Sequence, residues 1–232
     1  MENYILVIDS GNGGGYTLHY LRKECINENF LFLKDIHNAP YGNKTKKELL
    51  RISINNIDKI KQKYNIKAVV FACNTLSTTI LNEIKSHYKN MLILGVKPLI
   101  KQKKGKNTLV LSTTATLKLG HIDKNYQNVS NVFFVSFDDL AKRIDNNISD
   151  LNKLLPYLKQ RLNTISNIDY CTLGCTHYNL IKPLLKQILG DNVVFYENSP
   201  AVAKRLKELL KKYDTETHSQ KQGKTIILTS AE

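Results

Sequence analysis

The sequence has no hydrophobic run that approaches the roughly 20 residues needed to cross a membrane. The first apolar stretch, Tyr4 to Ile8, is too short and too poorly flanked for a signal peptide, and it is typical of a strand instead. These absences exclude a membrane partner and favour a cytoplasmic location. Hydrophobic residues still make up 42% of the 232 residues, so we expect a folded globular protein with a substantial core.

Cysteine is scarce, with four residues in the chain: Cys25, Cys73, Cys171 and Cys175. In a cytoplasmic protein these are expected to be thiols rather than a disulfide framework. The sequence also lacks the C-x-x-C pairs that are typical of zinc sites. A cluster of Cys171, Cys175 and His177 is conceivable, but their side chains would not converge well where a strand passes into a turn. We therefore expect no metal.

Acidic residues are the minority charge, with 20 Asp and Glu against 34 Lys and Arg, so the formal net charge is +14. Such a charge invites a nucleic-acid or acidic partner. The lysines are dispersed, however, and neither arginine–aromatic interleaving nor a known nucleic-acid motif accompanies them. We expect no nucleic-acid partner, although a basic surface would attract an anionic substrate.

A glycine-rich turn, Asp9 to Gly15, follows the first expected strand but lacks the dinucleotide-binding spacing G-x-G-x-x-G. That spacing would require a glycine at Tyr16, and no suitably placed acid follows the second strand. A nucleotide cofactor is therefore not expected. We expect the glycines to let the backbone approach a small ligand closely, with Asp9 pointing into the site.

Two matched segments, Val69 to Thr75 and Leu173 to Tyr178, each contain a buried strand, a small residue, a cysteine and then two hydrogen-bonding side chains before a helix. Cys73 and Cys175 would therefore lie at the carboxyl ends of strands and face helix N-termini. Open α/β sheets bind ligands at that edge, and a thiol there is expected to have a lowered pKa. Two such cysteines, one in each half, indicate one site built from two similar domains.

The remaining periodicity predicts the other elements of both halves. Expected strands cover residues 30–33, 69–71, 91–94, 108–111, 132–135, 169–173, 193–196 and 225–228. Expected helices cover residues 18–25, 46–64, 77–84, 151–162, 180–188 and 201–212, with Pro156 ending or kinking the fourth. A charged stretch at 101–106 marks the restart of the pattern, and the last strand is expected to return to the sheet of the first domain.

Several kinds of chemistry remain open for the two cysteines. They could be structural residues of buried strands, or one could be a nucleophile paired with a histidine. They could also act as acid and base on opposite faces of one carbon, which would invert a stereocentre without a cofactor. Thiols suit that task because their pKa lies close to neutrality. Asp9 and His177 are placed to manage the protons of Cys73 and Cys175.

Five short motifs in the right order give the chain a resemblance to the cofactor-independent glutamate racemases of the aspartate/glutamate racemase superfamily. They are Asp9 to Gly11, Pro40 to Lys44, Ala72 to Thr75, Gly95 to Pro98 and Leu173 to Tyr178. The resemblance spans nearly the whole length. The second and fifth motifs favour the glutamate branch over the aspartate branch.

The resemblance implies an α/β fold of two pseudo-symmetric three-layer α/β/α domains, with mostly parallel sheets and the site in the cleft between them. In this numbering the first domain would cover residues 1–96 plus 204–232, and the second would cover residues 97–203. This arrangement agrees with the repeated pattern of the two halves.

The resemblance also implies roles for individual residues. Cys73 would act on the α-proton of the D enantiomer and Cys175 on that of the L enantiomer, with Asp9 beside Cys73 and His177 beside Cys175. The substrate cradle would contain Ser10, Tyr41, Gly42, Asn74, Thr75 and Thr176, and the second-half turn that completes the pocket would contribute Thr113, Thr114 and Thr116.

The sequence departs from the family pattern at four positions. Asn12 stands where the family usually has a small apolar residue, and Asn179 where a proline is common. Asn198 replaces a typical aspartate. The glutamate that the family carries in the middle of its second domain has no clear match, and Asp145, which is shorter, is the nearest candidate. None of these departures removes a thiol.

The leading hypothesis is a racemase that interconverts L- and D-glutamate and supplies D-glutamate for cell-wall peptidoglycan. One alternative is a racemase for another acidic amino acid, chiefly aspartate. The other is a diverged family member that acts as a non-catalytic binding protein. The family often dimerises, so a homodimer is an oligomeric state that the resemblance allows.

Overall fold

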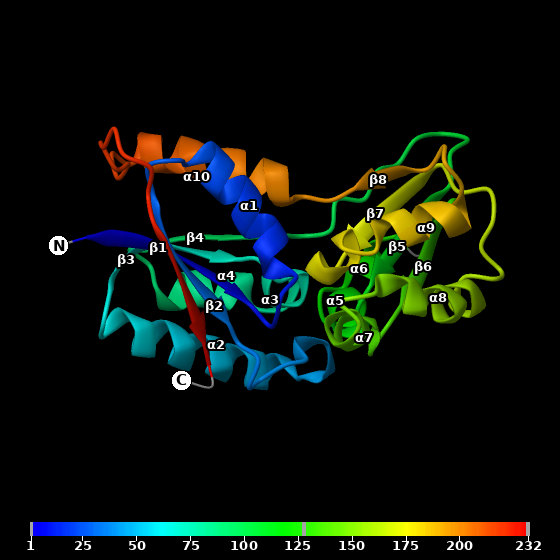
Figure 1. Cartoon of the computed structure of the whole chain (residues 1–232), viewed down its shortest axis with the longest axis horizontal. Helices are drawn as coiled ribbons and strands as arrows, with labels where there is room; N and C mark the ends of the chain where they lie inside the picture. The colour runs from blue at the N-terminus through cyan, green and yellow to red at the C-terminus, as the bar shows by residue number, and fades with distance from the viewer. Residues whose placement is uncertain (1, 127–128, 231–232) are drawn as a thin grey trace.

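The computed structural model describes residues 2–126 and 129–230, and its strands form two sheets in which every pairing is parallel. The ends of the expected first domain, residues 1 and 231–232, lie outside the described residues. The first sheet has the order β4-β3-β1-β2-β9 (Figure 1). Its strands are β1 (Asn3–Asp9), β2 (Asn29–Lys34), β3 (Asn65–Phe71), β4 (Leu92–Gly95) and β9 (Thr225–Thr229).

Helices cover both faces of the first sheet because successive strand residues point to opposite sides. Tyr4, Leu6 and Ile8 of β1 belong to the core under α2 (Lys46–Lys61), α3 (Asn74–Thr79) and α4 (Leu81–His87). Ile5 and Val7 belong to the core under α1 (Gly14–Glu24) and α10 (Ser199–Lys212). In Figure 1 the two sets of helices lie above and below the sheet.

The second sheet has the order β6-β5-β7-β8. Its strands are β5 (Thr108–Ser112), β6 (Val132–Ser136), β7 (Tyr170–Gly174) and β8 (Val194–Tyr196). Leu109 and Leu111 of β5 pack toward α7 (Leu140–Asn146), α8 (Leu155–Arg161) and α9 (Lys182–Leu189). Val110 packs on the other face, toward α5 (Thr114–Lys118) and α6 (Ile122–Asn125). Three short 3-10 helices complete the described elements: η1 (Tyr41–Asn43), η2 (Leu151–Leu154) and η3 (Thr176–Asn179).

The two sheets repeat one plan. In each, the first strand in sequence lies between the second and the third, and the fourth lies beside the third. The first sheet adds β9 on its edge, next to β2, which confirms the prediction that the last strand returns to the first sheet. The two halves are therefore pseudo-symmetric α/β/α domains, as expected from the sequence. They meet through contacts of α3 and η1 with α5, and of α1 with η3.

Candidate active site

Both cysteine motifs lie at topological switch points. In each sheet the chain leaves the first strand toward one neighbour and reaches the other neighbour later. Open α/β sheets bind ligands at the carboxyl ends of strands arranged in this way. Asp9 ends β1 and Cys73 follows β3 in the first sheet. Ser112 ends β5 and Cys175 follows β7 in the second. The predicted position of the cysteines at strand ends is therefore confirmed.

The two thiols are nearly enclosed, since Cys73 is 7% exposed and Cys175 is 8% exposed. Cys73 caps the N-terminus of α3, where a lowered pKa was expected. That expectation is wrong for Cys73. Burial and then the charge of Asp9 raise the pKa of the Cys73 thiol, and backbone N–H groups at the start of α3 offset this only in part. A smaller contribution to the raised pKa of Cys73 comes from the charge of Cys175.

Asp9 is completely buried and links the first half to the second. Its Oδ1 accepts a hydrogen bond from the backbone N–H of Gly11 at 2.9 Å. Its Oδ2 accepts one from the hydroxyl of Thr176 at 3.1 Å. Burial raises the pKa of Asp9, and the nearby His177 and the two hydrogen bonds oppose that effect. A carboxyl group with a raised pKa, close to the Cys73 thiol, can exchange a proton with it.

His177 lies between the Cys175 thiol and a carboxylate. Its Nδ1 is 3.9 Å from the Cys175 sulfur, and its Nε2 is 3.1 Å from Oδ2 of Asp145. Burial alone would lower the pKa of His177, but the contacts with Asp145 and Cys175 raise it well above its usual value. His177 is therefore set up to be protonated next to Cys175, as an acid that can return a proton to that sulfur.

Asp145 is the residue that sequence reasoning left out of the site. It is near the end of α7, and the sequence offered only one signal for it, a weak match to the family's second-domain glutamate. Burial alone would raise the pKa of Asp145. The hydrogen bond and charge of His177, the hydrogen bond from Asn12 and the charge of Lys34 together lower that pKa below its usual value. The carboxylate is therefore ionised where it meets His177.

Three of the predicted threonines form one buried cluster across the two halves. The hydroxyl of Thr75, on α3, is 3.1 Å from that of Thr113 and 3.0 Å from that of Thr116. Thr113 also caps α5, since its hydroxyl accepts from the backbone N–H of Thr116. Thr114, the first residue of α5, is only half-buried. The cluster joins the helix after Cys73 to the turn after β5.

The other predicted cradle residues differ in what they offer a ligand. Asn74 is 3% exposed, and its side-chain oxygen has no hydrogen-bond partner among the described residues. Ser10 is half-buried at the bend after β1. The Tyr41 hydroxyl donates to Asp35 at 2.5 Å, so this hydroxyl could only accept a hydrogen bond from a substrate. Gly42 lies against Thr113, which a Cβ would meet at 3.3 Å.

The glycine-rich turn after β1 packs closely against the turn that carries Cys175. A Cβ at Gly13 would lie 2.6 Å from the backbone nitrogen of His177 and from the hydroxyl oxygen of Thr176. The expectation that these glycines admit a ligand is corrected at Gly13, because the space beside it is filled by the turn that carries Cys175. Small residues here let the two halves of the site touch.

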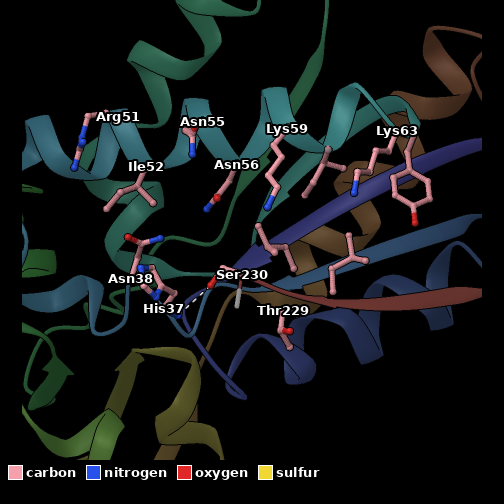
Figure 2. A pocket seen from close by; sticks show the side chains of 14 residues that line it. His37, Asn38, Arg51, Ile52, Asn55, Asn56, Lys59, Lys63, Thr229 and Ser230 are labelled. Carbon is pink, nitrogen blue, oxygen red and sulfur yellow. Dashed lines mark hydrogen bonds between the residues drawn. The ribbon is translucent and has the colours of Figure 1, made fainter. Parts of the chain in front are cut away.

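A cavity of about 680 Å³ lies elsewhere, between α2 and the edge of the first sheet (Figure 2). Arg51 and Lys59 of α2 line it, together with Lys63 just after the helix, opposite Asn38 and Ser230. None of the predicted site residues lines this cavity. Within residues 2–126 and 129–230, no helix is long and apolar enough to cross a membrane, and no group of three His, Cys, Asp or Glu side chains could hold a metal ion.

No protein-family model matches the chain. Curated relatives do: the glutamate racemase of Clostridium acetobutylicum is 32% identical over 239 residues, which cover 99% of this chain and 92% of the relative. The glutamate racemase of Clostridium kluyveri is 33% identical and covers 96% of this chain and 90% of the relative. The chain belongs to the glutamate racemase family. It is therefore an isomerase of the amino-acid racemase type, as its motifs implied.

Solved structures of the family share the fold at lower identity. Glutamate racemase isoform RacE1 from Bacillus anthracis superimposes with a TM-score of 0.82 at 24% identity, over 99% of this chain and 89% of that one. Glutamate racemase from Escherichia coli, in complex with L-glutamate and the activator UDP-MurNAc-ala, gives a TM-score of 0.81 at 22% identity. That match covers 99% of this chain and 91% of the other. Both matches show that this chain shares their fold.

Proposed function

We propose that this racemase interconverts L- and D-glutamate without a cofactor, by proton transfer at the α-carbon between Cys73 and Cys175. The observation that carries the proposal is the pair of enclosed thiols, one at the switch point of each sheet, in two halves that the 3.1 Å hydrogen bond from Thr176 to Asp9 joins. A carbon between them would present one face to each thiol. Inversion needs that geometry, because the proton that leaves one face is replaced from the other.

The proton balance closes without another reactant. The Cys73 thiolate takes the α-proton of D-glutamate, and the Cys175 thiol gives its own proton to the opposite face, which produces L-glutamate. His177 then returns a proton to the Cys175 sulfur, and Asp9 receives one from Cys73. The reverse reaction begins from a Cys175 thiolate and ends with a proton from Cys73. The solvent restores the starting protonation state.

The raised pKa of Cys73 in the free site is compatible with its acting as a base. A nearby positive charge favours the ionised form of a thiol, and the substrate brings an ammonium group into the site. Substrate binding would therefore generate the thiolate where and when it is needed. Until then the raised pKa keeps the Cys73 thiol protonated, which protects it from oxidation.

Buried polar groups around the thiols fit an amino acid with two carboxylates. The unpartnered side-chain oxygen of Asn74 would accept a hydrogen bond from the substrate ammonium. The Thr75, Thr113 and Thr116 hydroxyls bond to one another, and a substrate carboxylate could accept from this cluster by replacing one of these contacts. The net charge of +14 would attract glutamate, which has one more carboxylate than ammonium groups, to the protein. We propose that the D-glutamate formed supplies peptidoglycan synthesis.

Circular dichroism of purified protein with each enantiomer of glutamate and aspartate, in reductant and without cofactor, tests the proposal. Decay of both glutamate signals to zero is the expected result. Decay for aspartate alone would reassign the substrate, and flat traces from folded protein would favour a binding protein.

Substitution of either thiol tests the mechanism within the same assay. Cys73→Ser and Cys175→Ser should each lose racemisation by about 10²- to 10⁴-fold or more, because a serine hydroxyl ionises far less readily than a thiol. Both variants should unfold at the wild-type temperature. A serine variant that kept the wild-type rate would refute the two-thiol mechanism.

A further inference from the structure

A continuous chain of polar contacts runs from the edge of the site to the Cys175 thiol. The Lys34 ammonium donates to Asn12 Oδ1 at 3.0 Å, and Asn12 Nδ2 donates to Asp145 Oδ1 at 3.0 Å. The other carboxylate oxygen of Asp145 is 3.1 Å from Nε2 of His177. The second nitrogen of the same imidazole ring, Nδ1, is 3.9 Å from the Cys175 sulfur. An ammonium can only donate, so it fixes the Asn12 amide with its oxygen toward Lys34 and its NH₂ toward Asp145.

We propose that Asn12 and Lys34 are positioning residues that hold the Asp145 carboxylate against His177 and so control the protonation of Cys175. The inference rests on the proposed racemase function. Neither residue touches the reacting atoms. Both act through Asp145, and Lys34 acts through Asn12.

The contact joins elements from both halves of the molecule. Lys34 is the last residue of β2 and Asn12 lies in the turn between β1 and α1, whereas Asp145 belongs to α7 of the second half. The Asp145 side chain is 31% exposed, so water competes for its oxygens. An amide bonded to one oxygen restricts rotation of the carboxylate and keeps the other oxygen aimed at His177.

The surroundings of His177 leave little freedom for another arrangement. A Cβ at Gly11 would lie 2.9 Å from Asp145 Oδ2 and 3.0 Å from His177 Nε2. The backbone N–H of Gly13 also points at Nε2, at 3.3 Å. A protonated Nε2 donates to Asp145 and an unprotonated Nε2 accepts from Gly13, so this nitrogen has a partner in both states.

A double-mutant cycle with the wild-type racemase as reference tests the inference. Asn12→Ala should lower kcat/KM for glutamate about tenfold, and Asp145→Asn should lower it further. The double variant should be no slower than Asp145→Asn alone, because Asn12 acts through the carboxylate. The losses must be equal in both directions, since the two enantiomers have equal free energies. Asn90→Ala, which removes an exposed amide from the turn before β4, is the matched control.

Rescue separates positioning from a merely structural role. Asp145→Glu in the Asn12→Ala background should regain most of the lost rate, because the longer acid reaches His177 without help. Lys34→Arg should retain more activity than Lys34→Met. Multiplicative losses in the cycle, or an Asn12→Ala variant with wild-type kcat/KM, would overturn the inference.

A readout that does not need catalysis distinguishes failure of the inference from failure of the proposed function. The imidazole nitrogens of ¹⁵N-histidine-labelled protein report the pKa of His177. Asp145, Cys175 and Asp9 face His177, and Lys34 acts on Asp145. In the wild-type background, Asn12→Ala should lower the pKa of His177. In the Asp145→Asn background, the same substitution should leave that pKa unchanged. An unchanged pKa in the first comparison would refute the positioning role. A wild-type protein that leaves glutamate unracemised would refute the proposed function alone.

Discussion

Gly13→Ala should separate the two halves of the candidate site. The new methyl group would lie 2.6 Å from the backbone nitrogen of His177 and from the Thr176 hydroxyl oxygen, and ordinary contact begins at 3.4 Å. The turn after β1 and the turn that carries Cys175 must then move apart by about 0.8 Å. Gly13 has φ −56°, so the substitution adds no backbone strain and its effect is steric alone.

That displacement predicts two measurable losses. Overpacking of this kind costs about 1–3 kcal/mol of stability, which lowers the melting temperature by roughly 2–4 °C for each kcal/mol in a chain of this size. A shift approaching 1 Å between the catalytic groups costs about 10²-fold in rate. Thermal unfolding followed by circular dichroism measures the first loss, and racemisation of D-glutamate measures the second.

Gly15→Ala is the matched control, two residues along in the same glycine-rich turn. A Cβ there meets nothing within 4 Å, and the residue lies in α1. Alanine should therefore stabilise the helix by about 0.5–1 kcal/mol and leave the racemisation rate unchanged. If Gly13→Ala matched Gly15→Ala in both stability and rate, the close packing of the two turns would not be what fixes the site.

Three further substitutions test other parts of the structure. Lys67→Met should lower the free energy of unfolding, measured by urea denaturation, by about 3–5 kcal/mol. The reason is that Lys67 Nζ lies 2.6 Å from Oε2 of Glu28 and both side chains are less than 10% exposed. A loss below about 1 kcal/mol would contradict this. Asp9→Asn should raise the melting temperature at pH 8, since burial raises the pKa of Asp9 and makes its ionised form unfavourable in the fold. That gain should vanish as the pH falls below about 4, where the carboxyl is protonated in both states, and a gain independent of pH would count against it. Thr75→Val should lower the free energy of unfolding by about 1 kcal/mol, because the Thr75 hydroxyl contacts Thr113 and Thr116 of the other half. An unchanged melting temperature would argue against that contribution.

Much of the fold could be predicted because its signals are local. Alternation and apolar runs located the strands of both sheets, and the repeated cysteine motifs indicated the two halves. Helix starts were less accurate: the helix after Cys73 begins at Asn74 rather than near Ser77, and it ends at Thr79 before α4 begins at Leu81. Pro156 breaks the expected helix at 151–162 as predicted, and it does so by starting α8 after the 3-10 helix η2.

The electrostatics of the site could not be predicted because they depend on burial and on contacts between distant segments. A helix N-terminus suggested a lowered pKa for Cys73, but burial and Asp9 outweigh the few N–H groups of a six-residue helix. Asp145 and Asn12 are 133 residues apart, and no spacing rule relates them. Their contact emerges only when α7 packs beside the glycine turn, which is why sequence reasoning treated both residues as departures rather than as part of the site.

The most direct test of the two-thiol account is the fate of the α-hydrogen during racemisation of L-glutamate in D₂O. Early in the reaction, mass spectrometry should find deuterium at the α-carbon of nearly all D-glutamate formed and almost none in the remaining L-glutamate. That pattern follows from one thiol removing the proton and the other delivering a solvent-derived deuteron. D-glutamate that retained the original hydrogen, or deuterium that appeared equally in unreacted L-glutamate, would show that a single group serves both faces and would contradict the account.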